Sequence, residues 1–431
     1  MMKPLKIYKF GGASIQDAPS MARIRGIIAS ALNQFQLVVV VSALGKTTNA
    51  LEKVVLAWHQ NQTSELQKAL DFVAQTHREL ISELDVSDRS KEQIRQSFDI
   101  RLAQLEVLLT ASPHPNYNLN YDQVVSYGEL FSTTIFSEYL VLSGLQARFQ
   151  DVREWIITEE PFREARIVWE ETEKILQPFV EHPNSLGPLT ITQGFIGQIR
   201  GTHLTSTLGR EGSDYTGAIL ASALHATSLT IWKDVAGVMN ADPRLFPDAV
   251  KFDVMSYREA IEMTYYGATV IHPKTIKPLE NKQIPLEVNS FLRPDLIGTV
   301  ISADAISIHH TPCYIVVKNQ ILLSISSKDF SFIAEHGLSA IFQAISEVGL
   351  RVRLMQNSAI SFSVVLDNDT FKIPGLLQSL KEKFRVKFNE NVELWTIRHY
   401  NQEVIQKTTE GRTILMEQRN RETAQFVMET K

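Results

Sequence analysis

The sequence is poor in cysteine, because its 431 residues include a single one, Cys313. One cysteine excludes an intrachain disulfide and a cysteine-rich zinc site, and it favours a reduced, intracellular setting. Long apolar runs are also missing. No stretch approaches the roughly 18 apolar residues of a membrane span, and the N-terminus "MMKPLKIYKFGG" lacks the apolar core of a signal peptide. We therefore expect a cytoplasmic protein without a membrane partner.

Excess positive charge is absent too. The formal net charge is -5, which gives no support to nucleic-acid binding as a main role. The chain has no HExxH motif and no close cluster of histidines and carboxylates, so we predict no permanent metal site. With 44% hydrophobic and 21% charged residues, the composition is that of a globular protein with length for two or three domains.

The first 295 residues or so alternate strand-like and helix-like segments. "LKIYKF" and the apolar run "QLVVVVSAL" flank a helical segment, which predicts a βαβ unit. Residues from about 48 to 110 have helical composition throughout. We therefore predict an α/β fold with an open, mostly parallel sheet sandwiched by helices.

The pattern changes near residue 302, where shorter strands and helices follow in the order βαββα and then a hairpin-like tail. We divide the chain into a domain over 1–298 and a smaller α+β region over 299–431. Within that region we expect one full module at about 315–385 and an abbreviated second one.

A glycine turn follows the first predicted strand in "YKFGGASI". Lys9 ends the strand, and Gly11 and Gly12 can take positive φ and bring backbone N–H groups close to an anion. The following helix adds a positive N-terminus. A plain turn with a solvated lysine explains this stretch alone about equally well, because short glycine-rich turns are weak signals.

A second loop, "TLGREGSDYT", places Arg210 in a tight turn before a helix that starts near Ser213 and Asp214. Arginine there offers a bidentate clamp for a carboxylate or phosphate. For this motif alone, a simple helix N-cap at Ser213 or Asp214 is the favoured interpretation.

Two further loops carry charged residues. "WKDVAGVMNADPRLFPDA" offers Asp234, Asp242 and Arg244 as nucleotide contacts, although Asp-Pro is also a common turn. "YYGATVIHPKTI" offers Lys274, whereas we interpret His272 as a packed histidine. Lysines, an arginine turn and a helix-starting aspartate on loops of one α/β domain are what phosphoryl transfer requires.

Six motifs in this order, "KFGGASI", "VVVVSALGKTTN", "GELFS", "TLGREGSDYT", "WKDVAGVMNADPR" and "YYGATVIHPKT", resemble the aspartate kinases of the amino-acid kinase superfamily. The resemblance covers nearly the whole chain, and the second lobe is similar to the ACT regulatory domains, which are ferredoxin-type modules. It implies transfer of the γ-phosphoryl of ATP, bound with Mg²⁺, to the β-carboxylate of L-aspartate. It also implies a homodimer formed through the ACT-like region, a possible amino-acid effector there, and a place in lysine, threonine and methionine biosynthesis.

The resemblance also implies residue roles. Lys9, Asp214 and Lys274 would be catalytic. Phosphate would be bound by Gly11, Gly12 and Ser42, aspartate by Thr48, Glu129, Arg210 and Ser213, and the nucleotide by Asp234, Arg244 and Lys274. The acceptor carboxylate, with an ordinary pKa of about 4, is already ionised and needs no general base. Two alternatives stay open: a kinase for another carboxylate substrate such as glutamate, and a catalytically silent amino-acid sensor.

Several positions depart from the family pattern. In the catalytic motifs, less usual residues stand at Ala13, Glu211, Lys233, Ala236 and Met239. The motif "GREGSD" thereby places an acid near a site for anions. In the ACT-like region Gly337 fits a glycine expected before a helix. Arg353, and Ala359 after Ser358, stand where acids are usual, so we expect weak or absent inhibition by lysine.

Overall fold

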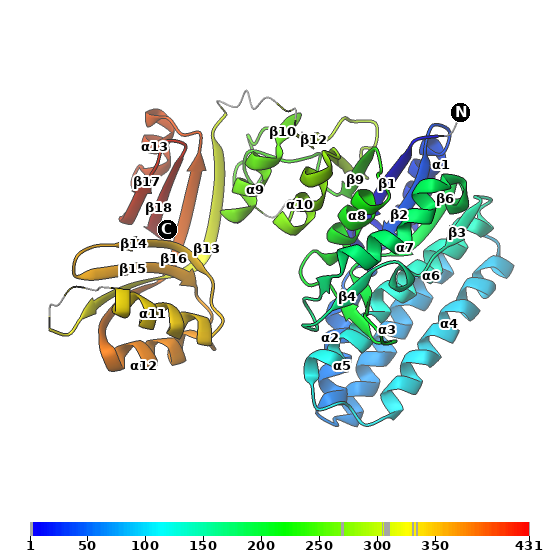
Figure 1. Ribbon diagram of the computed structural model, residues 1–431, viewed down its shortest axis with the longest axis horizontal. Coiled ribbons are helices and arrows are strands. Elements are labelled where there is room, and N and C mark those ends of the chain that lie inside the picture. The colour runs from blue at the N-terminus through cyan, green and yellow to red at the C-terminus, as the bar shows by residue number, and fades with distance from the viewer. Residues whose placement is uncertain are drawn as a thin grey trace. The chain divides into compact units, whose positions relative to one another are not determined.

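The computed structural model describes residues 3–268, 271–303, 305, 311–329, 332 and 335–430. Thr269 and Val270 of the "YYGATVIHPKT" motif therefore lie outside the described residues. The chain forms two compact units (Figure 1). Their ranges are Met1–Val238, Lys251–Ile261 and Thr269–Ser307 for the first, and Met239–Val250, Glu262–Ala268 and Ile308–Lys431 for the second. None of the described helices is long and apolar enough to cross a membrane.

The first unit is built on an eight-stranded sheet in the order β10-β12-β11-β9-β1-β2-β6-β3. β1 (Leu5–Phe10) lies near its centre and pairs in parallel with β2 (Gln36–Val41) and β9 (Ser228–Lys233). All its pairs are parallel except β11 with β12. The other strands are β3 (Ala147–Phe149), β6 (Leu189–Gln193), β10 (Val254–Ser256), β11 (Leu286–Ser290) and β12 (Thr299–Ser302). The prediction of a mostly parallel sheet is confirmed.

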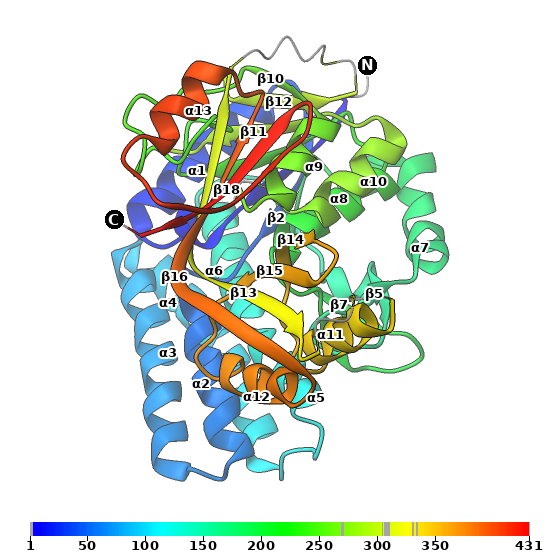
Figure 2. The same cartoon turned by 90° about the vertical axis from the view of Figure 1, so that its left-hand side faces the viewer.

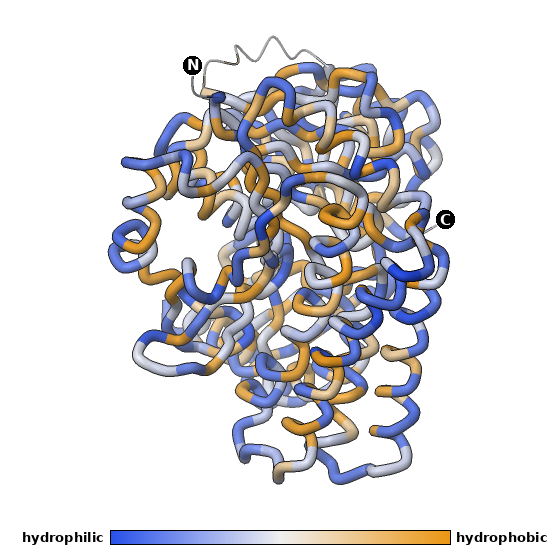
Figure 3. The backbone as a smooth tube through the Cα atoms, turned by 90° about the vertical axis from the view of Figure 1, so that its right-hand side faces the viewer, coloured by the Kyte–Doolittle hydropathy of each residue, from blue (hydrophilic) through white to orange (hydrophobic). Residues whose placement is uncertain are grey.

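Helices cover both faces of this sheet. Tyr8 and Phe10 of β1 belong to one apolar core with the first six helices, whose turns alternate between apolar and polar residues (Figure 3). These helices are α1 (Ala18–Ala31), α2 (Thr47–His59), α3 (Thr63–Glu83), α4 (Asp88–Thr110), α5 (Tyr117–Val125) and α6 (Tyr127–Leu142). Lys9 points to the opposite face, because side chains alternate along a strand. There α8 (Gly212–Ala223) packs on β1 and β9, and α10 (Pro273–Lys282) packs on α8. The predicted helical stretch over about 48–110 is divided into α2, α3 and α4.

Smaller elements complete the first unit. A four-stranded sheet has the order β5-β4-β7-β8. Its strands are β4 (Ile157–Glu159), β5 (Arg166–Ile167), β7 (Ile196–Ile199) and β8 (Thr205–Thr207). The first unit also contains α7 (Trp169–Glu181) and the 3-10 turns η1 (Gly12–Ser14), η2 (Val152–Glu154) and η3 (Pro183–Leu186). α9 (Tyr257–Tyr265) begins in the first unit and ends in the second. The side chain of Asp17 caps α1 by accepting from the Ser20 amide at 2.8 Å.

The second unit contains one six-stranded antiparallel sheet in the order β14-β15-β13-β16-β18-β17. β13 (Cys313–Ser327) and β16 (Phe384–Arg398) are long strands that pair along their length (Figure 2). The first half follows the predicted βαββα order. After β13 it contains α11 (Glu335–Glu347), β14 (Val352–Asn357), β15 (Ser361–Asp367) and α12 (Ile373–Lys383). The second half contains α13 (Gln402–Thr409), β17 (Ile414–Arg419) and β18 (Thr423–Glu429). The second unit is thus an α+β region on one antiparallel sheet, and its division into one full and one abbreviated module stays a prediction. Gly337 lies inside α11 and not before it, so that expectation is wrong.

The segment Met239–Val250 belongs to the second unit, although the division by sequence assigned it to the first domain. The carbonyl of Asn240 accepts from the Tyr314 amide at 2.7 Å, and its side-chain amide donates to the Pro312 carbonyl at 3.0 Å. Phe246 stacks on Tyr314 with ring centroids 5.0 Å apart. The loop that follows β9 is thus held by backbone and aromatic contacts of the second unit.

Candidate active site

A cavity of about 740 Å³ opens where β1, β2 and β9 end. Lys9 comes from β1, Ser42 follows β2, and Lys233 is the last residue of β9. Ligands of open α/β sheets bind at this edge, because the carboxyl ends of parallel strands meet there. The lining also includes Thr48, Asn118, Tyr121, Glu129, Pro161, Phe162, Arg163, Glu164, Phe195, Gly209, Arg210, Glu211, Gly212, Ser213 and Asp214.

The two glycines after β1 permit close packing against the loop after β2. A Cβ on Gly12 would lie 2.8 Å from the carbonyl oxygen of Ala43, which no real side chain tolerates. The Gly45 amide donates to the Gly12 carbonyl at 3.2 Å. Gly11 has φ -81°, and neither glycine uses the positive φ that glycine permits. Close approach, not a left-handed turn, requires glycine here.

Lys9 and Asp214 form a buried ion pair at the floor of the cavity. Lys9 Nζ lies 2.5 Å from Asp214 Oδ1, and the Asp214 side chain is only 3% exposed. Burial alone would raise the pKa of Asp214, but the charges of Lys9 and Lys233 hold that pKa below its usual value. Asp214 is therefore an ionised carboxylate that fixes the lysine beside the glycine turn.

Lys233 contacts the other oxygen of the Asp214 carboxylate. Its Nζ lies 3.5 Å from Asp214 Oδ2, and its side chain is 21% exposed. Sequence reasoning did not count Lys233 among the site residues. The available signal was its departure from the threonine usual at that position.

The arginine turn leads directly into α8. Glu211 has φ 55° and is the N-cap residue, but its side chain makes no capping bond. The interpretation of Ser213 or Asp214 as a simple cap is therefore wrong. Ser213 Oγ instead donates to Ser42 Oγ at 3.2 Å, and Asp214 turns toward Lys9. Arg210 is exposed at the rim of the cavity.

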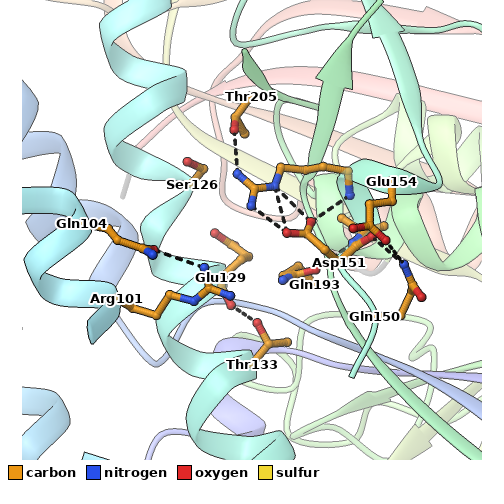
Figure 4. Close-up of polar contacts among 12 residues, drawn as sticks. Arg101, Gln104, Ser126, Glu129, Thr133, Gln150, Asp151, Glu154, Gln193 and Thr205 are labelled. Atoms are coloured by element: carbon orange, nitrogen blue, oxygen red, sulfur yellow. Dashed lines mark hydrogen bonds and ion pairs between the residues drawn. The ribbon is translucent and has the colours of Figure 1, made fainter. Parts of the chain in front are cut away.

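Glu129 comes from α6 (Figure 4). Its side chain is among those that line the cavity. Its Oε1 accepts from the Ala43 amide at 3.2 Å, and its Oε2 is buried without a hydrogen-bond partner among the described residues. Burial raises the pKa of Glu129 to about 8. A buried carboxyl group with one unsatisfied oxygen is a natural partner for an incoming ammonium group. Thr48 lines the same cavity.

A loop between β4 and β5 closes another side of the cavity, and sequence reasoning missed it. Asp122 anchors this loop by accepting from the Arg163 amide at 3.0 Å and from Thr207 Oγ1 at 2.7 Å. Burial raises the pKa of Asp122 to about 6. The Arg163 guanidinium lies 4.1 Å from the Tyr121 ring centroid. Only the fold brings these residues together, since no local motif marks them.

Three of the predicted nucleotide residues are not among the residues that line this cavity. Asp234 is exposed just after β9. Arg244 forms an ion pair with Asp242 at 2.7 Å within the second unit. Lys274 is exposed in the first turn of α10, and its amide donates to His272 Nδ1 at 3.2 Å. His272 is half-buried, and its side chain is the N-cap of α10.

Comparison with known proteins agrees with this fold. The model of the amino acid kinase family matches residues 4–290, and the chain belongs to this family of ATP-dependent kinases. Lysine-sensitive aspartokinase 3 of Escherichia coli (strain K12) is 33% identical over 91% of this chain and 86% of its own length. Chloroplastic aspartokinase 2 of Arabidopsis thaliana is 30% identical over 87% of this chain and 69% of its own length.

Solved structures of an aspartokinase are also similar to this chain. E. coli aspartokinase III in complex with lysine and aspartate superposes with a TM-score of 0.83 at 30% identity, covering 98% of this chain and 95% of that one. The same enzyme in complex with aspartate and ADP gives 0.80 at 29% identity, covering 99% and 96%. Within its family, this chain therefore stands with the aspartokinases.

Proposed function

We propose that the protein transfers the γ-phosphoryl group of MgATP to the β-carboxylate of L-aspartate, giving 4-phospho-L-aspartate and ADP. The observation that carries this proposal is the buried Lys9–Asp214 pair beside the glycine turn. It presents a fixed cation at the edge of the sheet where the cavity opens. The reaction would be the first step of lysine, threonine and methionine biosynthesis.

The chemistry requires cations more than a base. One oxygen of the β-carboxylate forms a bond to the γ-phosphorus. The bond from that phosphorus to the β,γ-bridging oxygen breaks, and its electron pair leaves with ADP. No proton is transferred, because the acceptor is already ionised. Lys9 neutralises charge on the phosphoryl group in transit, and the amides of Gly11 and Gly12, with Ser42, hold the phosphates.

Aspartate occupies the part of the cavity between α6 and the start of α8. Arg210 at the rim pairs with a substrate carboxylate, and Ser213 and Thr48 supply hydroxyl groups. Glu129 faces the α-ammonium group, which gives its buried Oε2 a partner. A side chain one methylene longer, as in glutamate, would move its carboxylate away from Lys9, and this favours aspartate over the alternative substrate.

Nucleotide contacts by Asp234, Arg244 and Lys274 stay predictions, as do the Mg²⁺ bound with ATP and the cytoplasmic location.

For the second unit we propose dimerisation through its six-stranded sheet region and a possible amino-acid effector site. The existence of a relative crystallised with lysine and aspartate supports the proposal that an aspartokinase can bind an amino-acid effector.

The test is ATP turnover with a panel of amino acids. We expect hydroxamate-trapped acyl phosphate and coupled ADP release with L-aspartate, and little of either with L-glutamate. Turnover with glutamate alone would favour the substrate alternative. Binding of amino acids without any turnover would favour a silent sensor. Absence of aspartate-dependent turnover would overturn the proposal.

A further inference from the structure

Lys233 lies in the cavity, but the reaction described above gives it no part. β9 pairs with β1 so that Ile231 lies beside Lys9. Parallel neighbours in register point to the same face, and so do residues two apart on one strand. Lys233 therefore points to the same face as Lys9, one step closer to the carboxyl edge where the cavity opens.

Asp214 holds both lysines on one carboxylate. Lys9 Nζ is 2.5 Å from Oδ1, and Lys233 Nζ is 3.5 Å from Oδ2. One carboxylate carries one negative charge, so this group of three side chains keeps a net positive charge inside a largely buried site. A phosphoryl group carries negative charge and would bind next to these two cations.

The balance of charge over the cavity depends on Lys233. The basic side chains of the lining are Lys9, Arg163, Arg210 and Lys233, and the acidic ones are Glu129, Glu164, Glu211 and Asp214. Burial keeps Glu129 protonated near neutral pH, because its pKa is raised to about 8. The cavity is then positive by one charge, and without Lys233 it would be neutral.

The positive charge of Lys233 stabilises the ionised form of Glu211. Burial raises the pKa of Glu211, and the charge of Lys233 is the strongest influence acting against that rise. Both residues are departures from the usual motif, one adding a negative charge and the other a positive charge. The two departures compensate each other electrostatically.

We propose that Lys233 is a second cation for the transferred phosphoryl group, held beside Lys9 by Asp214, and that it offsets the negative charge of Glu211. This inference rests on the proposed function, since it places the triphosphate in this cavity. The ammonium group binds the γ-phosphoryl oxygens and stabilises the charge that spreads over them as the phosphoryl group passes to its acceptor.

The test replaces Lys233 with methionine, which keeps the length of the side chain and removes its charge. We expect Lys233→Met to lower kcat by about 10- to 100-fold with the KM for aspartate within about twofold, and Lys233→Arg to recover most of the loss. Lys6→Met is the matched control. Lys6 is also a partly buried lysine of the central sheet, paired with Glu287 at 3.1 Å, but it lies outside the cavity lining.

A binding measurement separates phosphoryl contact from support of the fold. Lys233→Met should weaken binding of the imido analogue of ATP, which carries a γ-phosphate, about tenfold more than binding of ADP. Equal weakening of both nucleotides would indicate a structural role and overturn the proposal. Unchanged kcat in Lys233→Met would do the same.

Compensation is tested by adding Glu211→Gln. We expect the double variant to recover about tenfold of the kcat lost in Lys233→Met, because the uncompensated acid is then removed. Equal losses with and without Glu211→Gln would overturn the compensation. If the unaltered protein shows no aspartate-dependent turnover, the proposed function fails. The comparison of imido analogue with ADP then still decides whether Lys233 binds a γ-phosphate.

Discussion

The backbone amide of Ala43 donates to Oε1 of Glu129 at 3.2 Å, while Oε2 of the same buried carboxyl group has no hydrogen-bond partner among the described residues. The amide fixes the side chain from the loop after β2, which also packs against the glycine turn. One oxygen is thus held by the protein, and the other is left for a ligand. This geometry makes Glu129 sensitive both to pH and to the substrate.

The first prediction concerns aspartate binding and pH. Burial raises the pKa of Glu129 to about 8, and an ammonium group binds the ionised form. We expect kcat/KM for aspartate to rise about tenfold per pH unit up to about pH 8 and then to level off. Glu129→Gln should raise the KM for aspartate and abolish this rise. A wild-type profile that is flat between pH 6 and 8 would contradict the assignment.

The same group predicts how stability changes with pH. The folded pKa is about 8 and the ordinary value is 4.5, so between them the folded protein holds a proton that the unfolded chain has lost. The contribution of Glu129 to the free energy of unfolding is therefore complete below the ordinary pKa and is lost as pH rises through 8. Asp122, whose pKa is raised to about 6, loses its proton at a lower pH than Glu129 does. Denaturant unfolding should show that Glu129→Gln removes the decline between pH 6 and 8.

A third prediction separates the two lysines that the motifs marked as catalytic. Lys9→Ala should lower kcat by about 10²- to 10³-fold, because it removes a cation fixed at the cavity floor. Its fold should persist, since Lys233 still pairs with Asp214. Lys274 is exposed outside the cavity lining, so Lys274→Ala should mainly raise the KM for ATP. Steady-state kinetics with both substrates varied checks this, and a loss of kcat below tenfold in Lys9→Ala would contradict the role of Lys9.

The fourth prediction concerns the backbone at Glu211. Its φ of 55° is a left-handed conformation that glycine adopts freely and glutamate does not. We expect Glu211→Gly to increase the free energy of unfolding by about 1 kcal/mol, measured by urea denaturation. Glu211→Gln is the matched control, because it removes the charge and keeps the strained conformation. Equal stability of the two variants would show that the backbone carries no strain.

Local patterns were sufficient to predict much of this molecule. The apolar runs of β1 and β2 and the helical spacing between them predicted a parallel sheet, because both features depend on neighbouring residues only. The glycine turn and the arginine turn were located for the same reason. Their backbone details could not be located, since Gly11 has a negative φ and Glu211 has a positive one.

Other site residues depend on contacts between distant parts of the chain. Lys233 meets Asp214 only because β9 and α8 lie against β1. Arg163 reaches the cavity because Asp122 of α5 holds the amide of this loop residue. The assignment of Met239–Val250 to the second unit depends on backbone bonds of Asn240. No local periodicity encodes such contacts, so sequence reasoning could not assign them.

The last prediction concerns regulation by lysine. In the second unit the guanidinium of Arg353 binds Asp367 through two bonds of 3.0 Å each, and the Gln320 amide donates to the same carboxylate at 3.1 Å. This carboxylate of β15 is therefore already engaged, and Arg353 itself would repel a cationic effector. Titration of the aspartate-dependent activity with L-lysine should show weak or no inhibition at millimolar concentrations. Lysine-sensitive aspartokinase 3 of E. coli is the positive control in the same assay. Strong inhibition of this protein at those concentrations would contradict the expectation and would require a cation site elsewhere in the chain.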